Sequence, residues 1–407
     1  MKRNRKKRNI ENRDKKTLKR AEIYRKYCTG CGACAAEGVA FSPDERGFDT
    51  PGLQEKDVEF CSGVCPAAGK AFRLQQETEW GYFNSCRLSW STDAELRHHA
   101  SSGGTLTALC LYLLETGCVD GIIQTRVSPE DPALTVTDVC TTRDEVIASA
   151  GSRYTTSSPL RKITDQIEPG RKYAFVGKPC DTSALTAMIR AHYKNLDQIK
   201  YVLSFFCAGQ PSREANLRLL RMLGCETADE CESLTYRGNG WPGFASAAGK
   251  DGMIRQMSYH DSWGKILGRD IRLSCRLCAD GVGEFSDLSC GDAWYMTEDR
   301  RPDFSEHEGR NVTFTRSEKG KKLLEDAAAA GYLRLEDYDL DELQCVQRFQ
   351  FERKRNLRPQ ISAMRLAGRP VPFYDAGKLR AFNRPLSPEK NLRRFAGTLR
   401  RIMKGKI

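Results

Sequence analysis

The sequence predicts an α/β protein in which a small cysteine-rich module precedes a larger body, and three observations lead to this prediction. Residues 172–176 and 199–206 are apolar runs typical of buried strands, and a helix capped by Asp181 and running to about His192 joins them. Strands connected in this way are normally parallel neighbours in one sheet. Glycine, proline and cysteine are concentrated in residues 28–75, and a chain of 407 residues is long enough for two or three domains.

The cysteine-rich segment has the spacing of an iron–sulfur loop. Its first three cysteines follow one another at intervals of three: Cys28, Cys31 and Cys34. Ferredoxin-type loops place three thiolates on one tight turn and take a fourth from farther along, usually before a proline. Cys65, which precedes Pro66, is therefore the expected fourth ligand, with Cys61 as the alternative. The spacing favours a 4Fe–4S cluster over zinc, because zinc sites usually pair two C-x-x-C knuckles or add histidines.

Charge is distributed unevenly along the chain. The net charge is +12, but residues 1–27 contribute +10 and residues 378–407 contribute +9, which leaves a mildly acidic body of −7. Basic tails attract nucleic acid, anionic lipid or an acidic protein, and they can equally be solvated ends. The body has no basic-aromatic stripe typical of a nucleic-acid groove, so nucleic acid is not an expected partner.

The cysteine count bears on the compartment. Seventeen cysteines is an odd number, and the charged N-terminus has no apolar stretch behind it. We therefore expect reduced thiols in the cytoplasm and no disulfide framework. The longest apolar run is too short to cross a bilayer, so no transmembrane segment is expected. We divide the chain into a basic arm, a ferredoxin-like module, a body and a basic helical tail: residues 1–27, 28–75, 76–345 and 346–407.

Several elements of the body can be placed from the sequence. A helix is expected to open at Ser101 with serine or threonine as its N-cap, and to end at Gly117. Residues 76–100 are expected only to link the module to the body. The further expected elements are a strand over 119–127, a short helix near 143–150 and a β-rich stretch over 225–262.

Four more cysteines are expected to meet at one edge of the sheet. Cys180 and Cys207 follow the carboxyl ends of the two predicted parallel strands, which lie on the same sheet edge. Cys275 and Cys278 form a C-x-x-C motif, which supplies two thiolates and needs two more. Cys180 and Cys207 are the natural complement to that half site.

These cysteines combine with two further motifs, Ser102-Gly-Gly-Thr and Gly151-Ser-Arg-Tyr. In this order the chain resembles the coenzyme F420 hydrogenase/dehydrogenase beta-subunit family, which includes 7-hydroxymethyl chlorophyll a reductase, over roughly residues 25–345. The resemblance implies a mixed sheet flanked by helices that carries FAD beside a 4Fe–4S cluster. It assigns that inner cluster to Cys180, Cys207, Cys275 and Cys278. The N-terminal module of some members is matched by Cys28, Cys31, Cys34 and Cys65, which implies a second 4Fe–4S cluster.

The flavin ligands that the resemblance implies lie on two segments. They are Ser102, Gly103, Gly104 and Thr105, followed by Gly151, Ser152, Arg153, Tyr154 and Thr155. A glycine turn before a helix lets the backbone approach a diphosphate, and the helix start offers unpaired N–H groups. The alternative for this turn is an ordinary helix cap. No G-x-G-x-x-G motif supports a Rossmann mode of binding FAD.

The resemblance also implies a function. It indicates an oxidoreductase that passes electrons between a hydride-exchanging partner, either the deazaflavin coenzyme F420 or another small molecule, and ferredoxin or a partner redox subunit. FAD and the two clusters would carry the electrons. The alternative is an electron-transfer subunit of a larger hydrogenase or dehydrogenase complex that performs no chemistry by itself. No catalytic side chain can be assigned from the sequence.

Overall fold

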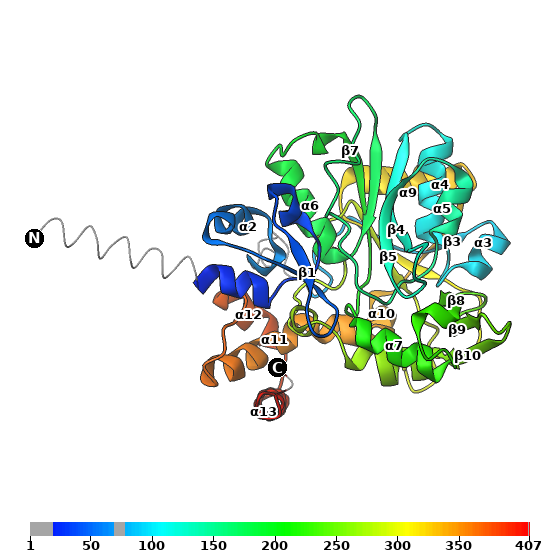
Figure 1. Cartoon of the computed structure of the whole chain (residues 1–407). Helices are drawn as coiled ribbons and strands as arrows, with labels where there is room; N and C mark the ends of the chain where they lie inside the picture. Colours follow the sequence, from blue (N-terminus) through cyan, green and yellow to red (C-terminus); the bar gives the residue numbers. More distant parts are fainter. Residues whose placement is uncertain (1–18, 69–77, 406) are drawn as a thin grey trace, which may run out of the picture.

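A computed structural model describes residues 19–68, 78–405 and 407, and its centre is an eight-stranded mixed sheet (Figure 1). The strand order is β13-β3-β12-β11-β7-β6-β4-β5. Strands β11, β7, β6 and β4 run parallel to one another. The remaining strands, β12, β3 and β13 on one side and β5 on the other, each pair antiparallel with their neighbours. The bounds are β3 (Ser85–Ser91), β4 (Gly121–Val127), β5 (Thr135–Cys140), β6 (Tyr173–Gly177), β7 (Ile199–Phe205), β11 (Leu288–Asp292), β12 (Asn311–Thr315) and β13 (Leu333–Asp337).

The predicted strand–helix–strand unit is confirmed. Strand β6, helix α6 (Pro179–Arg190) and strand β7 follow one another, and the two strands pair in parallel. Two details differ from the prediction. The N-cap is Lys178, and Asp181 accepts the Lys178 N–H at 2.9 Å from the third helical position. The helix stops before His192, which has a left-handed φ of 51°.

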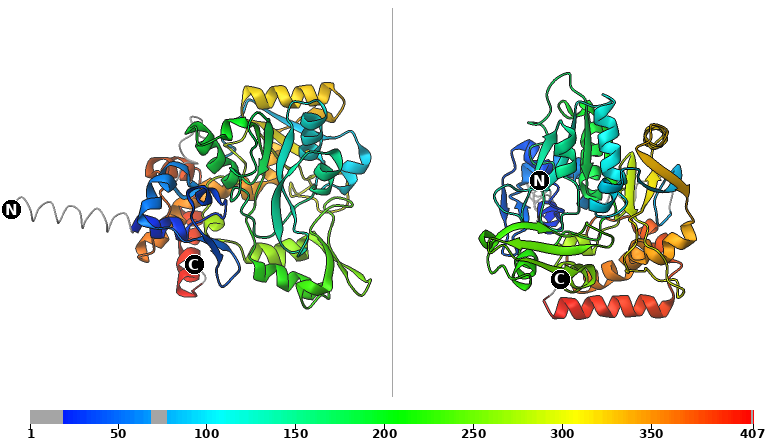
Figure 2. Two further views of the ribbon diagram at one scale, coloured as in Figure 1. Left: turned by 45° about the horizontal axis from the view of Figure 1, so that its top comes forward. Right: turned by 90° about the vertical axis from the view of Figure 1, so that its right-hand side faces the viewer.

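Alternate residues of the central strands enter two different cores. Ile122 and Ala174 pack into one core, whereas their neighbours Ile123 and Phe175 pack into the other, as the two-residue period of a strand requires. Both faces of the sheet are therefore covered by helices (Figure 2). One face carries α4 (Thr105–Glu115), α5 (Arg143–Ala148) and α9 (Glu318–Ala329), and the other carries α6 and α2 (Val58–Val64).

The segment before residue 100 is part of the sheet, which corrects the expectation of a simple link. Strand β3 pairs with both β12 and β13, and helix α3 (Ala94–His99) follows it. Ser89 lies in the middle of β3 and its hydroxyl is hydrogen-bonded to those of Thr105 and Thr313, at 3.0 and 2.6 Å. This buried network ties the strand to the start of α4.

Smaller elements surround the main sheet. The predicted β-rich stretch is confirmed as an antiparallel sheet of β8 (Cys231–Thr235), β9 (Phe244–Gly249) and β10 (Ile254–Ser258). Strands β1 (Phe41–Pro43) and β2 (Asp49–Pro51) form a hairpin in the N-terminal module. Further helices are α7 (Arg213–Met222), α8 (Leu273–Arg276), α10 (Leu340–Val346), α11 (Arg348–Leu366), α12 (Ala376–Asn383) and α13 (Pro388–Met403). Within the described ranges, no helix is long and apolar enough to cross a membrane.

The N-terminal module and the C-terminal helices share one hydrophobic core. A helix over residues 19–26 packs beside α11 and α12 at one end of the molecule, and α13 lies along α11 (Figures 1 and 2). Buried members of this core include Tyr24, Tyr27, Cys61, Leu277, Leu357, Ile361, Leu379 and Ile402. The predicted helical tail is thus docked on the module, and the packing does not favour a module that stands apart.

Candidate functional site

A cavity of about 300 Å³ opens at the carboxyl edge of the parallel strands, within the size range of small-molecule sites. Strands β6 and β7 end at its wall, and the start of α4 forms another side. Both segments expected to bind flavin line it: Ser102, Gly104, Thr105, Gly151, Ser152, Arg153, Tyr154 and Thr155. Gly103 is absent from the wall. The structure therefore brings together two segments that are almost 50 residues apart in the sequence.

The glycine turn before α4 differs in detail from the prediction. The N-cap is Gly104, with a left-handed φ of 72°, and it makes no side-chain cap, so Ser102 does not cap the helix. The Ser102 hydroxyl instead donates to the Arg310 carbonyl at 2.9 Å, and the Thr105 N–H donates to the Asn311 side chain at 3.3 Å. The next two N–H groups, of Leu106 and Thr107, have no hydrogen-bond acceptor among the described residues, and both residues line the cavity.

The second segment, residues 151–155, lines the cavity and is fixed by hydrogen bonds to neighbouring segments. The Ser152 N–H donates to the Ser101 hydroxyl at 2.6 Å, which connects this segment to the glycine turn. Arg153 donates from Nη1 to the Leu234 carbonyl at 2.9 Å, while its buried Nε has no partner in the described structure. The Tyr154 ring packs on Trp263 with ring centroids 4.8 Å apart. Together they offer a cationic nitrogen and aromatic surface to a bound group.

Sequence reasoning missed a cationic and aromatic group on the same wall. Arg237 is 3% exposed and donates to Asp292 at 2.9 Å. Its guanidinium lies over the rings of both Tyr259 and Trp294, 4.9 and 5.2 Å from their centroids. Burial opposes the charge, yet Asp292 raises the pKa of Arg237 above its ordinary value. The buried Nη2 of Arg237 has no partner in the described parts, so it is available to an acceptor in the cavity.

The four cysteines predicted for the inner cluster lie near the carboxyl edge of the parallel strands. Cys180 is the second residue of α6, where the positive end of the helix dipole favours an anionic thiolate or cluster. Cys207 lines the cavity and its thiol interacts electrostatically with Cys275 and Cys278. The Cys275 sulfur accepts the Gln210 N–H at 3.3 Å. The set therefore lies directly behind the cavity wall.

The outer cysteines are gathered by a tight turn. The Gly30 N–H donates to the Cys28 sulfur at 3.3 Å. Gly32 has a φ of 87°, and a side chain there would lie 2.7 Å from the backbone of Arg161, so only glycine fits. The Cys65 thiol interacts electrostatically with Cys28, Cys31 and Cys34 together, whereas Cys61 lies beside Cys34 and is hydrogen-bonded to it.

The two cysteine sets are neighbours. The Cys180 thiol interacts electrostatically with Cys31 of the outer set. The Ser274 hydroxyl, next to Cys275, donates to the Cys28 carbonyl at 2.8 Å. Across residues 19–68, 78–405 and 407, no three His, Cys, Asp or Glu side chains converge closely enough to hold one metal ion. In a 4Fe–4S cube each thiolate binds a different iron, so the separated thiols are compatible with such a cube.

Burial keeps these thiols neutral. It raises the pKa of Cys31 and Cys207 to about 12 and that of Cys278 to about 11. Thiolates, not thiols, bind metals, so occupation of either set must release protons.

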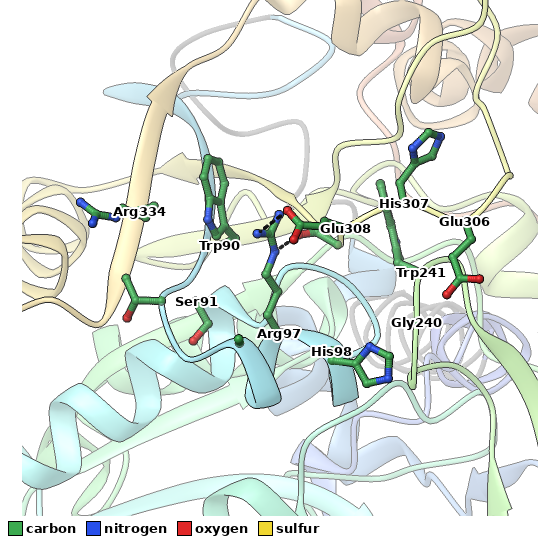
Figure 3. Close-up of a pocket in the computed structure, with 13 residues that line it drawn as sticks. Trp90, Ser91, Arg97, His98, Gly240, Trp241, Glu306, His307, Glu308 and Arg334 are labelled. Carbon is green, nitrogen blue, oxygen red and sulfur yellow. Dashed lines mark hydrogen bonds and ion pairs between the residues drawn. The ribbon is translucent and has the colours of Figure 1, made fainter.

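A second, more open pocket of about 600 Å³ lies on the other side of α3 (Figure 3). Arg97 points across it and pairs with Glu308 at 3.0 Å, while Trp90 and Trp241 form parts of its wall. His98 lines this outer pocket and not the inner cavity. Trp241 stacks on Trp294 with centroids 4.6 Å apart, so one aromatic pair separates the two pockets.

Comparisons with known proteins agree with this architecture. The chain is 26% identical over 304 residues to a coenzyme F420 hydrogenase subunit beta of Methanococcus voltae, covering 72% of this chain and 99% of that one. It is 25% identical over 249 residues to an F420-dependent formate dehydrogenase subunit beta of Methanocaldococcus jannaschii, covering 61% of this chain and 60% of the relative. It is 23% identical over 300 residues to the 7-hydroxymethyl chlorophyll a reductase of Oryza sativa, covering 73% and 60%. The chain thus spans less than two thirds of the latter two relatives.

A solved structure and two family models complete the comparison. A chain of the F420-reducing [NiFe] hydrogenase complex from Methanosarcina barkeri superposes with a TM-score of 0.56 at 19% identity, over 73% of this chain and 98% of that one, which shows the shared fold. Residues 88–164 match the N-terminal model of the coenzyme F420 hydrogenase/dehydrogenase beta subunit, and residues 170–341 match its C-terminal model. The chain therefore belongs to the coenzyme F420 hydrogenase/dehydrogenase beta-subunit family.

Proposed function

We propose that this chain is a cytoplasmic iron–sulfur flavoprotein that passes electrons between a hydride-exchanging small molecule and a one-electron redox partner. The observation that carries the proposal is the single cavity at the carboxyl edge of β6 and β7. Its wall contains both expected flavin segments and Cys207 of the inner cysteine set. A flavin in that cavity would lie against a cluster ligand.

The residues of the cavity fit FAD. The free N–H groups of Leu106 and Thr107 at the positive end of α4 suit a diphosphate. The unpartnered Nε of Arg153 is a second donor, and Tyr154, Trp263 and Trp294 offer ring faces. When bound, FAD would supply two-electron hydride exchange on one side and single-electron exchange with a cluster on the other. The chain would position the ring and exclude water from it.

Two 4Fe–4S clusters would continue the path. Cys180, Cys207, Cys275 and Cys278 would hold the inner cluster, and Cys28, Cys31, Cys34 and Cys65 the outer one. The order from flavin to inner set to outer set is supported by Cys207 on the cavity wall and by the proximity of Cys180 to Cys31. The outer cluster would exchange electrons with ferredoxin or a partner redox subunit.

The hydride partner would be coenzyme F420 or another reducible small molecule. Relatives named for coenzyme F420 support the first. The same relatives are subunits of larger enzymes, which supports a second candidate, an electron-transfer subunit with no activity of its own. Reduction of coenzyme F420 by the isolated chain would distinguish the two candidates.

The first experiment is the cofactor content of protein purified without oxygen. We expect about one flavin and about eight iron and eight sulfide per chain. Stoichiometric zinc without sulfide would reject the proposal.

The flavin position is tested by a charge at the start of α4. Thr107 lines the cavity at the third position of that helix, so Thr107→Glu places a carboxylate beside the expected diphosphate. The same carboxylate favours the helix, because it lies at the positive end of the dipole. We expect flavin affinity to fall by roughly ten- to a hundred-fold, with no loss of melting temperature. Thr107→Gln is the neutral control. Equal flavin content in both variants would show that the diphosphate does not bind at this turn.

A further inference from the structure

The described part of the N-terminal basic arm, residues 19–27, lies beside the basic C-terminal helices. The helix over residues 19–26 lies beside α12, and α13 lies on α11 at the same end of the molecule (Figures 1 and 2). Tyr27 donates to the Pro370 carbonyl, and the rings of Tyr24 and Phe373 are 5.7 Å apart. We call this surface the basic end; it consists of residues 19–27, 365–373 and 378–404.

The positive groups of the basic end are close to one another. Burial and the neighbouring Arg394 lower the pKa of Arg401. Like charges held together in this way repel, and an anionic partner would relieve the repulsion.

Helix α13 presents its own basic face outward. Thr398 and Ile402 are buried on its inner side. The outward residues recur at helical spacing and are exposed: Lys390, Arg393, Arg400 and Lys404. In the part of the chain that the structure describes, none of these four has a carboxylate within ion-pair distance. No described carboxylate therefore compensates their charge.

The basic end packs against part of the outer cysteine set. Cys34 and Cys65 pack against the core formed by the helix over 19–26, α11, α12 and α13. A groove of about 850 Å³, lined by Lys19, Arg365 and Arg369 among others, runs along the same surface. A partner bound here would lie closer to the outer cysteine set than to the inner cavity. Because electron tunnelling weakens steeply with distance, such a partner would exchange electrons with the outer cluster.

We propose that the basic end is the docking surface for an acidic one-electron redox protein, whose electrons enter or leave through the outer cysteine set. This inference rests on the proposed function for its redox role. Each transfer moves one electron, so that one protein is oxidised and the outer cluster reduced, or the reverse. An acidic protein is favoured over a lipid surface because the charge lies on several elements beside Cys34 and Cys65, not on one amphipathic helix alone.

The test uses an acidic ferredoxin with two 4Fe–4S clusters as the probe and the full chain as its partner. Affinity is measured by calorimetry at about 50 and about 300 mM salt. The variant is Arg393→Glu with Arg400→Glu. The control is Lys250→Glu with Arg334→Glu, two exposed basic residues of the body that also lack an ion pair among the described residues. Anionic phosphatidylglycerol vesicles are the second probe.

We expect the wild type and the control to bind ferredoxin, with weaker binding at high salt, and the α13 variant to bind roughly tenfold or more weakly. Equal binding by all three proteins, or no binding, would overturn the proposal. If none of the proteins binds ferredoxin, and the α13 variant loses vesicle binding that the wild type shows, the proposal is overturned and the surface is a membrane-binding one. Iron, sulfide and flavin contents of the same samples report on the proposed function separately, because binding is measured without turnover.

Discussion

The outer and inner cysteine sets are assembled in opposite ways. Three outer cysteines lie within residues 28–34 on one turn, shaped by glycines with positive φ. The inner four come from the start of α6, the loop after β7, and helix α8 with the loop that follows it, between positions 180 and 278. The outer turn is set by local backbone geometry, whereas the inner set exists only when three distant elements are folded. Yet the outer set also depends on the C-terminal helices, which complete its core.

The largest expected effect is the loss of that shared core. Deleting residues 1–75 would remove the buried side chains of Ile23, Tyr24, Tyr27, Val39, Leu53 and Val58. Six such side chains contribute roughly 10–20 kcal/mol of burial, which matches a typical total stability of about 5–15 kcal/mol. We expect an insoluble or unfolded product, measured by circular dichroism and gel filtration.

Deleting residues 1–18 alone is the control, because it leaves every described residue in place, and we expect it to fold. A stable, monomeric product of the longer deletion would show that the body needs neither the module nor the shared core.

Single ligand changes compare the two sets directly. Cys278→Ser should remove the inner cluster and Cys31→Ser the outer one, each lowering iron from about eight to about four per chain. Because Cys207 of the inner set lines the flavin cavity, we expect Cys278→Ser also to change the flavin spectrum, and Cys31→Ser to leave it unchanged. Full iron in both variants would contradict both assignments.

Two nearby cysteines, Cys65 and Cys61, are candidates for the fourth ligand of the outer cluster. The Cys65 thiol interacts with all three cysteines of the turn, whereas Cys61 is 2% exposed and lies beside Cys34. We expect Cys65→Ser to lose about four iron and Cys61→Ser to keep them, by iron analysis and electron paramagnetic resonance. The reverse pattern would assign the ligand to Cys61.

The sequence predicted those parts of the site that local chemistry controls. The spacing of Cys28, Cys31 and Cys34 is a local pattern, and the strand–helix–strand rule alone placed Cys180 near Cys207. The glycine turn was recognised, but its cap was not. A buried hydroxyl network and Asn311 of β12 hold the Ser102–Thr105 segment. The residues around Asn311 carry no sequence pattern that indicates this contact.

Contacts between distant elements account for what was missed. Arg237 follows strand β8 and meets Asp292 at the end of β11, 55 residues later. No local sequence pattern connects the two residues. Strand β3 was missed because its sequence, Ser-Cys-Arg-Leu-Ser-Trp-Ser, carries few of the β-branched residues typical of strands.

The smallest expected effect concerns a buried pair that connects the two regions. Glu284 lies in the loop after the inner C-x-x-C motif and pairs with Lys354 of α11, the helix that completes the outer core. Their side chains are 1% and 3% exposed. Burial raises the pKa of Glu284 to about 7, although Lys354 opposes the shift.

A carboxyl whose pKa is raised on folding contributes stability that is complete below its unfolded pKa of about 4.3 and is lost as the pH rises through about 7. We therefore expect the unfolding free energy of the wild type to fall between about pH 4.5 and 7, by on the order of 1–2 kcal/mol, relative to Glu284→Gln. Urea unfolding at the two pH values measures the difference, and the exposed Glu45→Gln is the control. A parallel pH dependence in all three proteins would mean that Glu284 stays ionised beside Lys354, so that the pair connects the inner loop to the outer core as a permanent ion pair.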